Sequence, residues 1–154
     1  MKKVIFVASS GGHLSEILNL KDLFSEYKYL LVTEKTEVTS KLENDYNIEY
    51  LKYGPNKNKF KYLGAVITNI FKCIKILKKF KPDTVISTGA QVGGIMCFFS
   101  KLFGKKIIYI ESLAKVTSLS VTGKMIYPFT NKFYVQWEPL AKKYKKAEYL
   151  GRLM

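Results

Sequence analysis

The 154-residue sequence is poor in residues on which several classes of function depend: it has one arginine, one histidine and two cysteines. Cys73 and Cys97 lie in apolar stretches without a CxxC or Cys/His spacing, so we expect reduced core thiols of a cytosolic protein and no metal site. Proteins that read base edges or grip phosphates bidentately rely on arginine, and here the only one is Arg152. Nucleic-acid binding is therefore disfavoured.

Long apolar runs are missing as well. The longest uncharged run, residues 84–100, includes glycine, serine, threonine and glutamine, whereas a membrane-spanning helix needs about 20 mostly apolar residues. The apolar run after Lys3 ends at the glycines 11 and 12, which is too early for a signal peptide. We therefore expect no transmembrane helix and a chain that starts directly in a buried strand.

Lysine is the residue in excess. With 26 Lys and Arg against 12 Asp and Glu, the formal net charge is +14. Residues 1–50 carry six basic and eight acidic residues, whereas residues 51–154 carry twenty basic and four acidic ones. A lysine-rich surface with interleaved aromatics suits an anionic membrane leaflet. At 47% hydrophobic residues the chain can also bury a core, which excludes a disordered basic tail.

Apolar β-branched runs alternate with segments of helical period along the whole chain, as in βαβ units around a parallel sheet. The sequence therefore predicts one α/β domain over residues 1–154, with a Rossmann-like, doubly wound parallel sheet. The expected strands are 3–8, 29–33, 48–51, 84–87, 106–110, 132–135 and 148–150. The expected helices are 13–25, 36–43, 60–80, 91–103, 120–129 and 137–143, and 53–59 is expected to be a flexible loop.

Two glycine-rich segments each follow an expected strand and begin an expected helix. They are Ser-Ser-Gly-Gly-His at 9–13 and Ser-Thr-Gly-Ala-Gln-Val-Gly-Gly at 87–94. Glycines let backbone N–H groups approach an anionic ligand, and two such turns at one sheet edge predict a crevice for a charged ligand. The alternatives are an ordinary tight turn at the first segment and close helix packing through Gly93 and Gly94 at the second.

Four single residues are candidates for chemistry. His13, the only histidine, is the best available general base. Glu111 follows an expected strand, where a carboxylate can accept hydrogen bonds from sugar hydroxyls, orient a histidine or cap a turn. Ser120 and Thr122 can contact an anion or a sugar, or act as helix N-caps. Their segment, 118–124, lacks the GxxxxGK[ST] pattern of nucleoside triphosphate sites.

The expected helix around residues 59–81 carries seven lysines and no acidic residue. A stripe that steps by four, three, four and three residues predicts its core side: Leu63, Ile67, Ile70, Ile74 and Leu77. Other large apolar side chains of this helix lie outside the stripe and are accompanied by lysines. Together they predict an element that lies in the membrane interface, formed by Phe60, Phe71, Lys72, Lys75, Lys78 and Lys79. The alternative is a solvated basic face over a large core.

Five segments taken in order resemble a known family. They are the segment 9–13, Ser-Thr-Gly-Ala at 87–90, Ile-Glu-Ser at 110–112, Ser-Leu-Ser-Val-Thr-Gly-Lys at 118–124 and Val-Gln-Trp at 135–137. The family is a polysaccharide-biosynthesis family that includes PssD-type proteins and the membrane-recruiting subunit of the dolichol-pathway N-acetylglucosaminyltransferase. The resemblance covers essentially the whole chain. It implies the amino-terminal acceptor domain of a MurG-like GT-B glycosyltransferase, with the UDP-sugar-binding domain on a separate chain.

The resemblance also implies a function. The chain would be a subunit of an inverting transferase, peripheral on the inner face of the cell membrane, that moves a sugar from a UDP-sugar to a polyprenyl-diphosphate-linked saccharide in capsule or exopolysaccharide synthesis. No cofactor, metal or nucleic acid is expected. The alternatives are a non-catalytic membrane scaffold that recruits and activates the catalytic partner and, less favoured, a basic nucleic-acid-binding protein.

Residue roles follow from the same resemblance. His13 would act as base, and Glu111 would contact the sugar or orient His13. Trp137 would lie at the partner interface or pack near the hinge. The acceptor and its pyrophosphate would be contacted by Ser10, Gly11, Gly12, Gly89, Gln91, Gly93, Ser112, Ser120 and Thr122.

Overall fold

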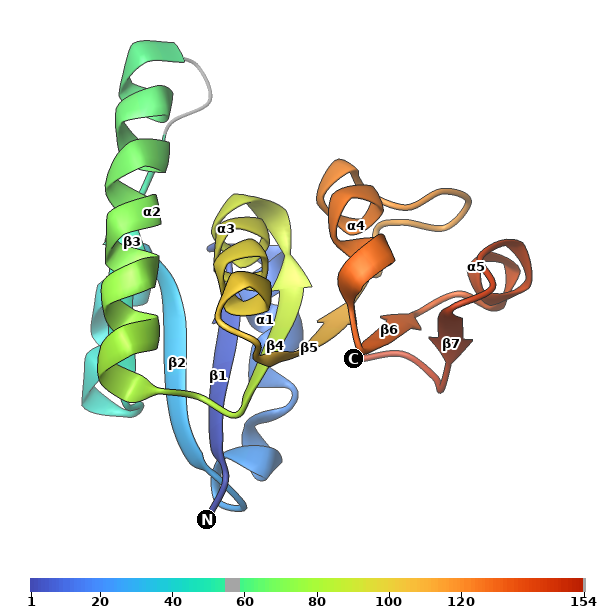
Figure 1. Cartoon of the computed structure of the whole chain (residues 1–154), viewed down its shortest axis with the longest axis horizontal. Helices are drawn as coiled ribbons and strands as arrows, with labels where there is room; N and C mark the ends of the chain where they lie inside the picture. The colour runs from blue at the N-terminus through green and yellow to red at the C-terminus, as the bar shows by residue number, and fades with distance from the viewer. Residues whose placement is uncertain (55–58, 154) are drawn as a thin grey trace.

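A seven-stranded, fully parallel sheet organises the chain in the computed structural model, which describes residues 1–54 and 59–153 (Figure 1). The spatial order is β3-β2-β1-β4-β5-β6-β7, which confirms the predicted doubly wound fold. The strands are β1 (Lys3–Ala8), β2 (Lys28–Lys35), β3 (Ile48–Lys52), β4 (Thr84–Gly89), β5 (Lys106–Ile110), β6 (Lys132–Val135) and β7 (Ala147–Tyr149). Residues 55–58 of the expected loop lie outside the described residues.

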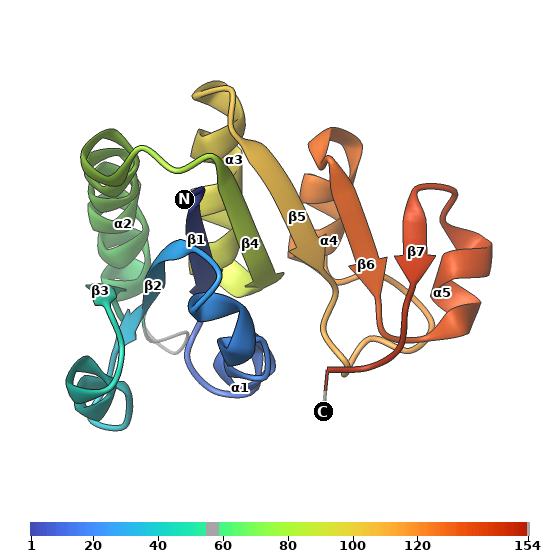
Figure 2. The same ribbon diagram turned by 90° about the horizontal axis from the view of Figure 1, so that it is seen from below.

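Helices cover both faces of the sheet. α2 (Lys59–Phe80), α3 (Ala90–Leu102) and α4 (Val121–Ile126) lie side by side on one face, and α1 (Gly12–Leu18) lies on the other (Figures 1 and 2). α5 (Glu138–Lys143) packs near β7 at the far edge. Among the described residues, no helix is long and apolar enough to span a bilayer.

Three predicted helices are wrong in type or extent, because short 3-10 turns replace all or part of them. These turns are η1 (Lys21–Phe24), η2 (Thr39–Asn44) and η3 (Tyr127–Phe129). The chain leaves the helix after Leu18, and this break lets Phe24 pack against Phe6 and Tyr29 with ring centroids 4.6 and 4.5 Å apart. Tertiary packing of aromatic rings thus overrides the local helical pattern.

The predicted core stripe of α2 is confirmed only in its second half, where Leu77 is buried and Ile70 and Ile74 are half-buried. Leu63 and Ile67 are 56% and 49% exposed, whereas the helix buries Ala65, Asn69, Cys73, Ile76 and Leu77. Asn69 explains this orientation, because its side chain accepts from Lys52 N at 2.7 Å and donates to Lys52 O at 2.9 Å. Lys52 ends the edge strand β3, whose backbone groups need such a partner. Leu63 and Ile67 therefore face outward, together with Phe60 and Phe71.

The core contains both cysteines, as predicted. Cys73 on α2 and Cys97 on α3 are fully buried and unbridged. Burial raises the pKa of each thiol to about 12. Neither thiol is therefore a reactive thiolate at neutral pH.

Candidate functional site

β1 and β4 are neighbours in the sheet, while the helices that follow them, α1 and α3, cover opposite faces. A doubly wound sheet is expected to form its ligand crevice at this place. The two glycine turns meet here. His13 Nδ1 lies 2.8 Å from the carbonyl oxygen of Thr88, and Thr88 Oγ1 donates to the carbonyl oxygen of His13 at 2.7 Å. The structure thus brings together the two segments that the sequence predicted to share an edge.

This contact defines the state of the imidazole. A carbonyl oxygen can only accept, so Nδ1 must carry the proton and the neutral ring has its lone pair on Nε2. Among the described residues nothing hydrogen-bonds Nε2, and the side chain is half-buried. His13 is thereby held in the tautomer that a general base requires.

The turn before His13 is open to solvent. Gly11 and Gly12 are exposed, and a Cβ built on either meets no atom within 4 Å. Gly11 has φ +88°, a conformation that favours glycine. Two hydrogen bonds fix Ser10, because its N–H and hydroxyl donate to Glu34 Oε2 at 3.1 and 3.2 Å. Glu34 comes just after the expected strand 29–33, but the strand is longer than predicted and Glu34 lies buried within β2.

The second turn differs from the first. Gly89 has φ +106° and is buried, and a Cβ there would clash with the Tyr109 hydroxyl beside His13 Cε1. Burial, with Glu111 nearby, raises the pKa of Tyr109, so its hydroxyl stays protonated. The Nε2 donor of Gln91 is buried and has no hydrogen-bond partner in the described part of the chain. The turn therefore offers an unpaired donor close to the crevice.

Gly93 serves close packing. It is buried, and a Cβ would clash with Ser87 Oγ on β4. We expect Gly93→Ala to destabilise the protein by about 1–3 kcal/mol through overpacking. Gly64→Ala, in open space on α2, should stabilise it by about 0.5–1 kcal/mol through helix propensity. Urea unfolding of both variants tests this, and equal stabilities would contradict it.

Glu111 occupies a structural position. Its side chain is fully buried, and Oε1 accepts from Ser112 N at 3.0 Å. Oε2 accepts from the N–H and hydroxyl of Ser120 at 2.9 and 3.1 Å, while Ser120 Oγ accepts from Gly123 N and so caps α4. Thr122 packs against Gly94 of α3. These groups hold the segment between β5 and α4, and the hydrogen bonds of Glu111 go to Ser112 and Ser120, not to His13.

Two residues of this edge were missed by sequence reasoning. Glu16 on α1 is buried and accepts from Ser112 Oγ and Leu113 N, each at 3.0 Å, and from Gln136 Nε2 at 3.3 Å. Gln136, at the end of β6, is 2% exposed. The sequence contained one indication of Glu16: it is an acidic residue between Leu14 and Ile17, on the face of the expected helix that should point inward.

Trp137 is engaged within the chain. Its Nε1 donates to Leu113 O at 2.6 Å, and the guanidinium of Arg152 lies 3.9 Å from the ring centroid. The two predicted roles of Trp137, at a partner interface or in packing near the hinge, stay predictions. Among the described residues, no group of three His, Cys, Asp or Glu is arranged to hold a metal ion.

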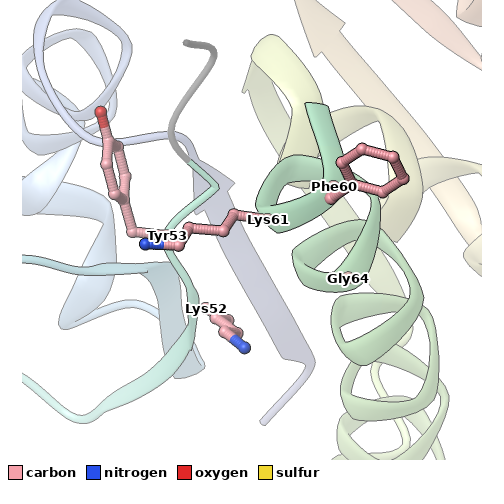
Figure 3. Close-up of a pocket in the computed structure, with 5 residues that line it drawn as sticks. All are labelled: Lys52, Tyr53, Phe60, Lys61 and Gly64. Carbon is pink, nitrogen blue, oxygen red and sulfur yellow. The ribbon is translucent and has the colours of Figure 1, made fainter. Parts of the chain in front are cut away.

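A surface cavity of about 560 Å³ opens between the end of β3 and the start of α2 (Figure 3). In Figure 3 the Lys61 side chain extends from α2 toward Tyr53. Gly54 next to it approaches Ala65 and Gln91 closely, so the cavity neighbours the second glycine turn. Its lining residues are Lys52, Tyr53, Phe60, Lys61 and Gly64.

The outer face of α2 is apolar along most of its length. Phe60 and Phe71 are 91% and 70% exposed, and Leu63 and Ile67 lie exposed between them at helical spacing. Exposed lysines border this face toward the end of α2: Lys72, Lys75, Lys78 and Lys79. Of these, Lys79 pairs with Glu49 at 3.5 Å.

Comparison with solved structures shows that the chain has the fold of one half of larger GT-B proteins. The structure superimposes on MurG of Acinetobacter baumannii with TM-score 0.75 and 17% identity, covering 90% of this chain and 43% of MurG. The UDP-N-acetylglucosamine 2-epimerase of Rickettsia bellii gives TM-score 0.75 and 17% identity, covering 100% of this chain and 46% of the epimerase. The chain thus spans less than half of these structures, and the likeness concerns the fold alone.

Sequence comparison identifies the family to which the chain belongs. The family model "Oligosaccharide biosynthesis protein Alg14 like" matches residues 56–153. The mouse UDP-N-acetylglucosamine transferase subunit ALG14 is 31% identical over 99% of this chain and 83% of its own length. The Schizosaccharomyces pombe subunit is 32% identical over 97% and 82%. The chain belongs to the Alg14 family.

Proposed function

We propose that this chain is the acceptor-binding subunit of a two-chain glycosyltransferase that moves a sugar from a UDP-sugar to a polyprenyl-diphosphate-linked saccharide. The observation that carries the proposal is the meeting of the two glycine turns, where His13, with Nδ1 on the carbonyl oxygen of Thr88, follows two exposed glycines. The names of the mouse and fission yeast relatives, which call them transferase subunits, support a multi-chain enzyme. Capsule or exopolysaccharide assembly is the setting that the sequence resemblance implied.

In this proposal the chain's own residues bind the acceptor and remove its proton. The N–H groups of Gly11 and Gly12 face the pyrophosphate, and Gln91 Nε2 supplies a further donor. His13 Nε2 takes the proton of the acceptor hydroxyl as its oxygen bonds to the anomeric carbon of the sugar. The bond from that carbon to UDP breaks, and UDP leaves with the bonding electrons on the opposite face, stabilised by the partner chain.

Glu111, Ser112 and Ser120 have an indirect role in this scheme. Their hydrogen bonds keep the β5–α4 segment in place beside the crevice. Because both oxygens of Glu111 are occupied and the side chain is fully buried, we assign it to positioning rather than to proton transfer.

The apolar outer face of α2 supports peripheral docking on the inner face of the cell membrane. Fully burying a phenylalanine is worth about 1.5–3 kcal/mol, and each lysine near an anionic leaflet adds about 1 kcal/mol. Phe60 belongs both to this face and to the cavity beside β3. A lipid whose chain lies in the bilayer thus has its head group next to the sheet edge that holds His13.

One observation favours a second function. In it, the chain is a non-catalytic scaffold that recruits and activates the catalytic chain. The hydrogen bonds of Glu111 and Ser120 all support the fold of the described residues. The scaffold and the acceptor subunit differ in whether substitution of His13 changes turnover.

Binding of acceptor and donor to the chain alone tests the proposal. We expect phosphatidylcholine nanodiscs that contain polyprenyl-diphosphate-N-acetylglucosamine to bind about tenfold more tightly than nanodiscs without it, because pyrophosphate contacts are charge-assisted. Isothermal titration with UDP-N-acetylglucosamine should give no binding heat. Equal binding to both kinds of nanodisc, or tight binding of the UDP-sugar, would contradict the assignment.

A further inference from the structure

Glu16 is a buried carboxylate without a cationic partner. It is 8% exposed in a chain of net charge +14, and the ion pairs of the described residues do not include it. Burying a carboxylate is costly unless hydrogen bonds compensate it. Here the compensation comes from Ser112 Oγ, Leu113 N and Gln136 Nε2. Glu16 therefore joins α1 to the segment after β5 and to the end of β6.

The donors around Glu16 occupy both of its carboxyl oxygens. Gln136 Nε2 donates to Glu16 Oε2 and to the carbonyl oxygen of Glu111, while Gln136 Oε1 accepts from Leu153 N at 2.7 Å. Turning the Gln136 amide over would put oxygen against oxygen at Glu111 and N–H against N–H at Leu153. Its orientation is thus determined, and Glu16 must accept on both oxygens.

α1 is short and is held at two points. It has seven residues and an N-cap, Gly11, without a side-chain hydrogen bond. Its first turn is fixed through His13 and Thr88, and its middle through Glu16. A helix this short has little stability of its own, so these contacts determine where it lies.

We propose that Glu16 is a positioning residue for His13. By fixing the middle of α1 it keeps His13 Nδ1 on the carbonyl oxygen of Thr88 and leaves Nε2 for the acceptor hydroxyl. Through Gln136 the same network includes the backbone N–H of Leu153, so the C-terminal segment contributes to the position of α1. The expected effect of Glu16 on turnover rests on the proposed function. Its effect on the position of His13 does not.

Glu16→Gln tests this inference with almost no change of shape. Whichever way the new amide turns, one N–H group meets either Gln136 Nε2 or Leu113 N, so one bond of the network is lost. Glu26→Gln is the matched control, because it removes one negative charge from an exposed position. His13 is the chain's only histidine, so its ¹⁵N imidazole signals need no assignment.

We expect the Nδ1–H of His13 to exchange with solvent about tenfold faster in Glu16→Gln than in the control, the equivalent of losing one buried hydrogen bond. In the reconstituted transferase, kcat should fall about tenfold while KM for the UDP-sugar stays unchanged. Imidazole signals equal to those of the control overturn the proposal. Altered signals with unchanged kcat support the positioning and remove His13 from the role of base.

Two variants at Leu153 test the same network if Glu16→Gln does not fold. Both variants lose the leucine side chain, but Leu153→Pro also removes the N–H that donates to Gln136 Oε1, whereas Leu153→Ala retains it. We expect faster exchange at His13 in Leu153→Pro than in Leu153→Ala. Identical His13 signals in these two variants would contradict the network.

Discussion

Replacing His13 with asparagine should lower the turnover of the reconstituted transferase by about 10²–10⁴-fold, the range for loss of a general base. Asparagine can still donate from the position of Nδ1 to the carbonyl oxygen of Thr88, so the turn should stay intact. It has no basic nitrogen in place of Nε2. Steady-state rates at saturating UDP-sugar and lipid-linked acceptor measure the effect.

Ser15→Ala is the control for this experiment, since Ser15 is exposed on the same helix and bonds only to the carbonyl oxygen of Gly11. Its turnover should match that of the unsubstituted chain. If His13→Asn also retained full turnover, the scaffold function would hold in place of the catalytic one.

The second large effect concerns the outer face of α2. We expect Phe60→Ser/Phe71→Ser to weaken binding to anionic liposomes about 100-fold, because two exposed phenylalanines lose their partial burial in the interface. Leu23→Ser/Val38→Ser removes two exposed apolar side chains outside α2 and should bind normally. Liposome flotation across a lipid concentration series gives both affinities.

Two outcomes of this experiment count against membrane docking. One is equal binding of the two double variants. The other is salt-sensitive binding to RNA or DNA that exceeds binding to anionic liposomes, which would restore the nucleic-acid function suggested by the charge.

The two glycine turns were predictable because parallel strands place their carboxyl ends on one edge. The segments around His13 and Gly89 each followed a clear apolar run, so their meeting needed no knowledge of contacts. The tautomer of His13 was not predictable. It depends on the carbonyl oxygen of Thr88, which is 75 residues away in the sequence.

The core side of α2 could not be predicted from periodicity, because this helix has two apolar faces. The larger residues Leu63 and Ile67 suggested the core but face outward. The inner face is determined by a polar residue, Asn69, which satisfies the backbone of Lys52. A period of 3.6 residues reveals a stripe but not which stripe the sheet covers.

Glu111 shows that the role of a side chain is also hard to predict from the sequence. A carboxylate at the end of a strand is well placed for chemistry, and the sequence alone cannot tell that role from a structural one. In the structure its side-chain oxygens accept from donors that come later in the chain, Ser112 and Ser120. Glu16 escaped notice for the opposite reason, since its partners Leu113 and Gln136 are about 100 residues away.

The most direct test of the central claim is sugar transfer itself, measured with this chain alone, with a UDP-sugar-binding partner chain alone and with both together. Radiolabelled UDP-N-acetylglucosamine and a polyprenyl-diphosphate-linked acceptor are the substrates, and label in the lipid phase is the product. We predict product only when both chains are present. Full activity of this chain alone, or of the partner alone, would contradict the account.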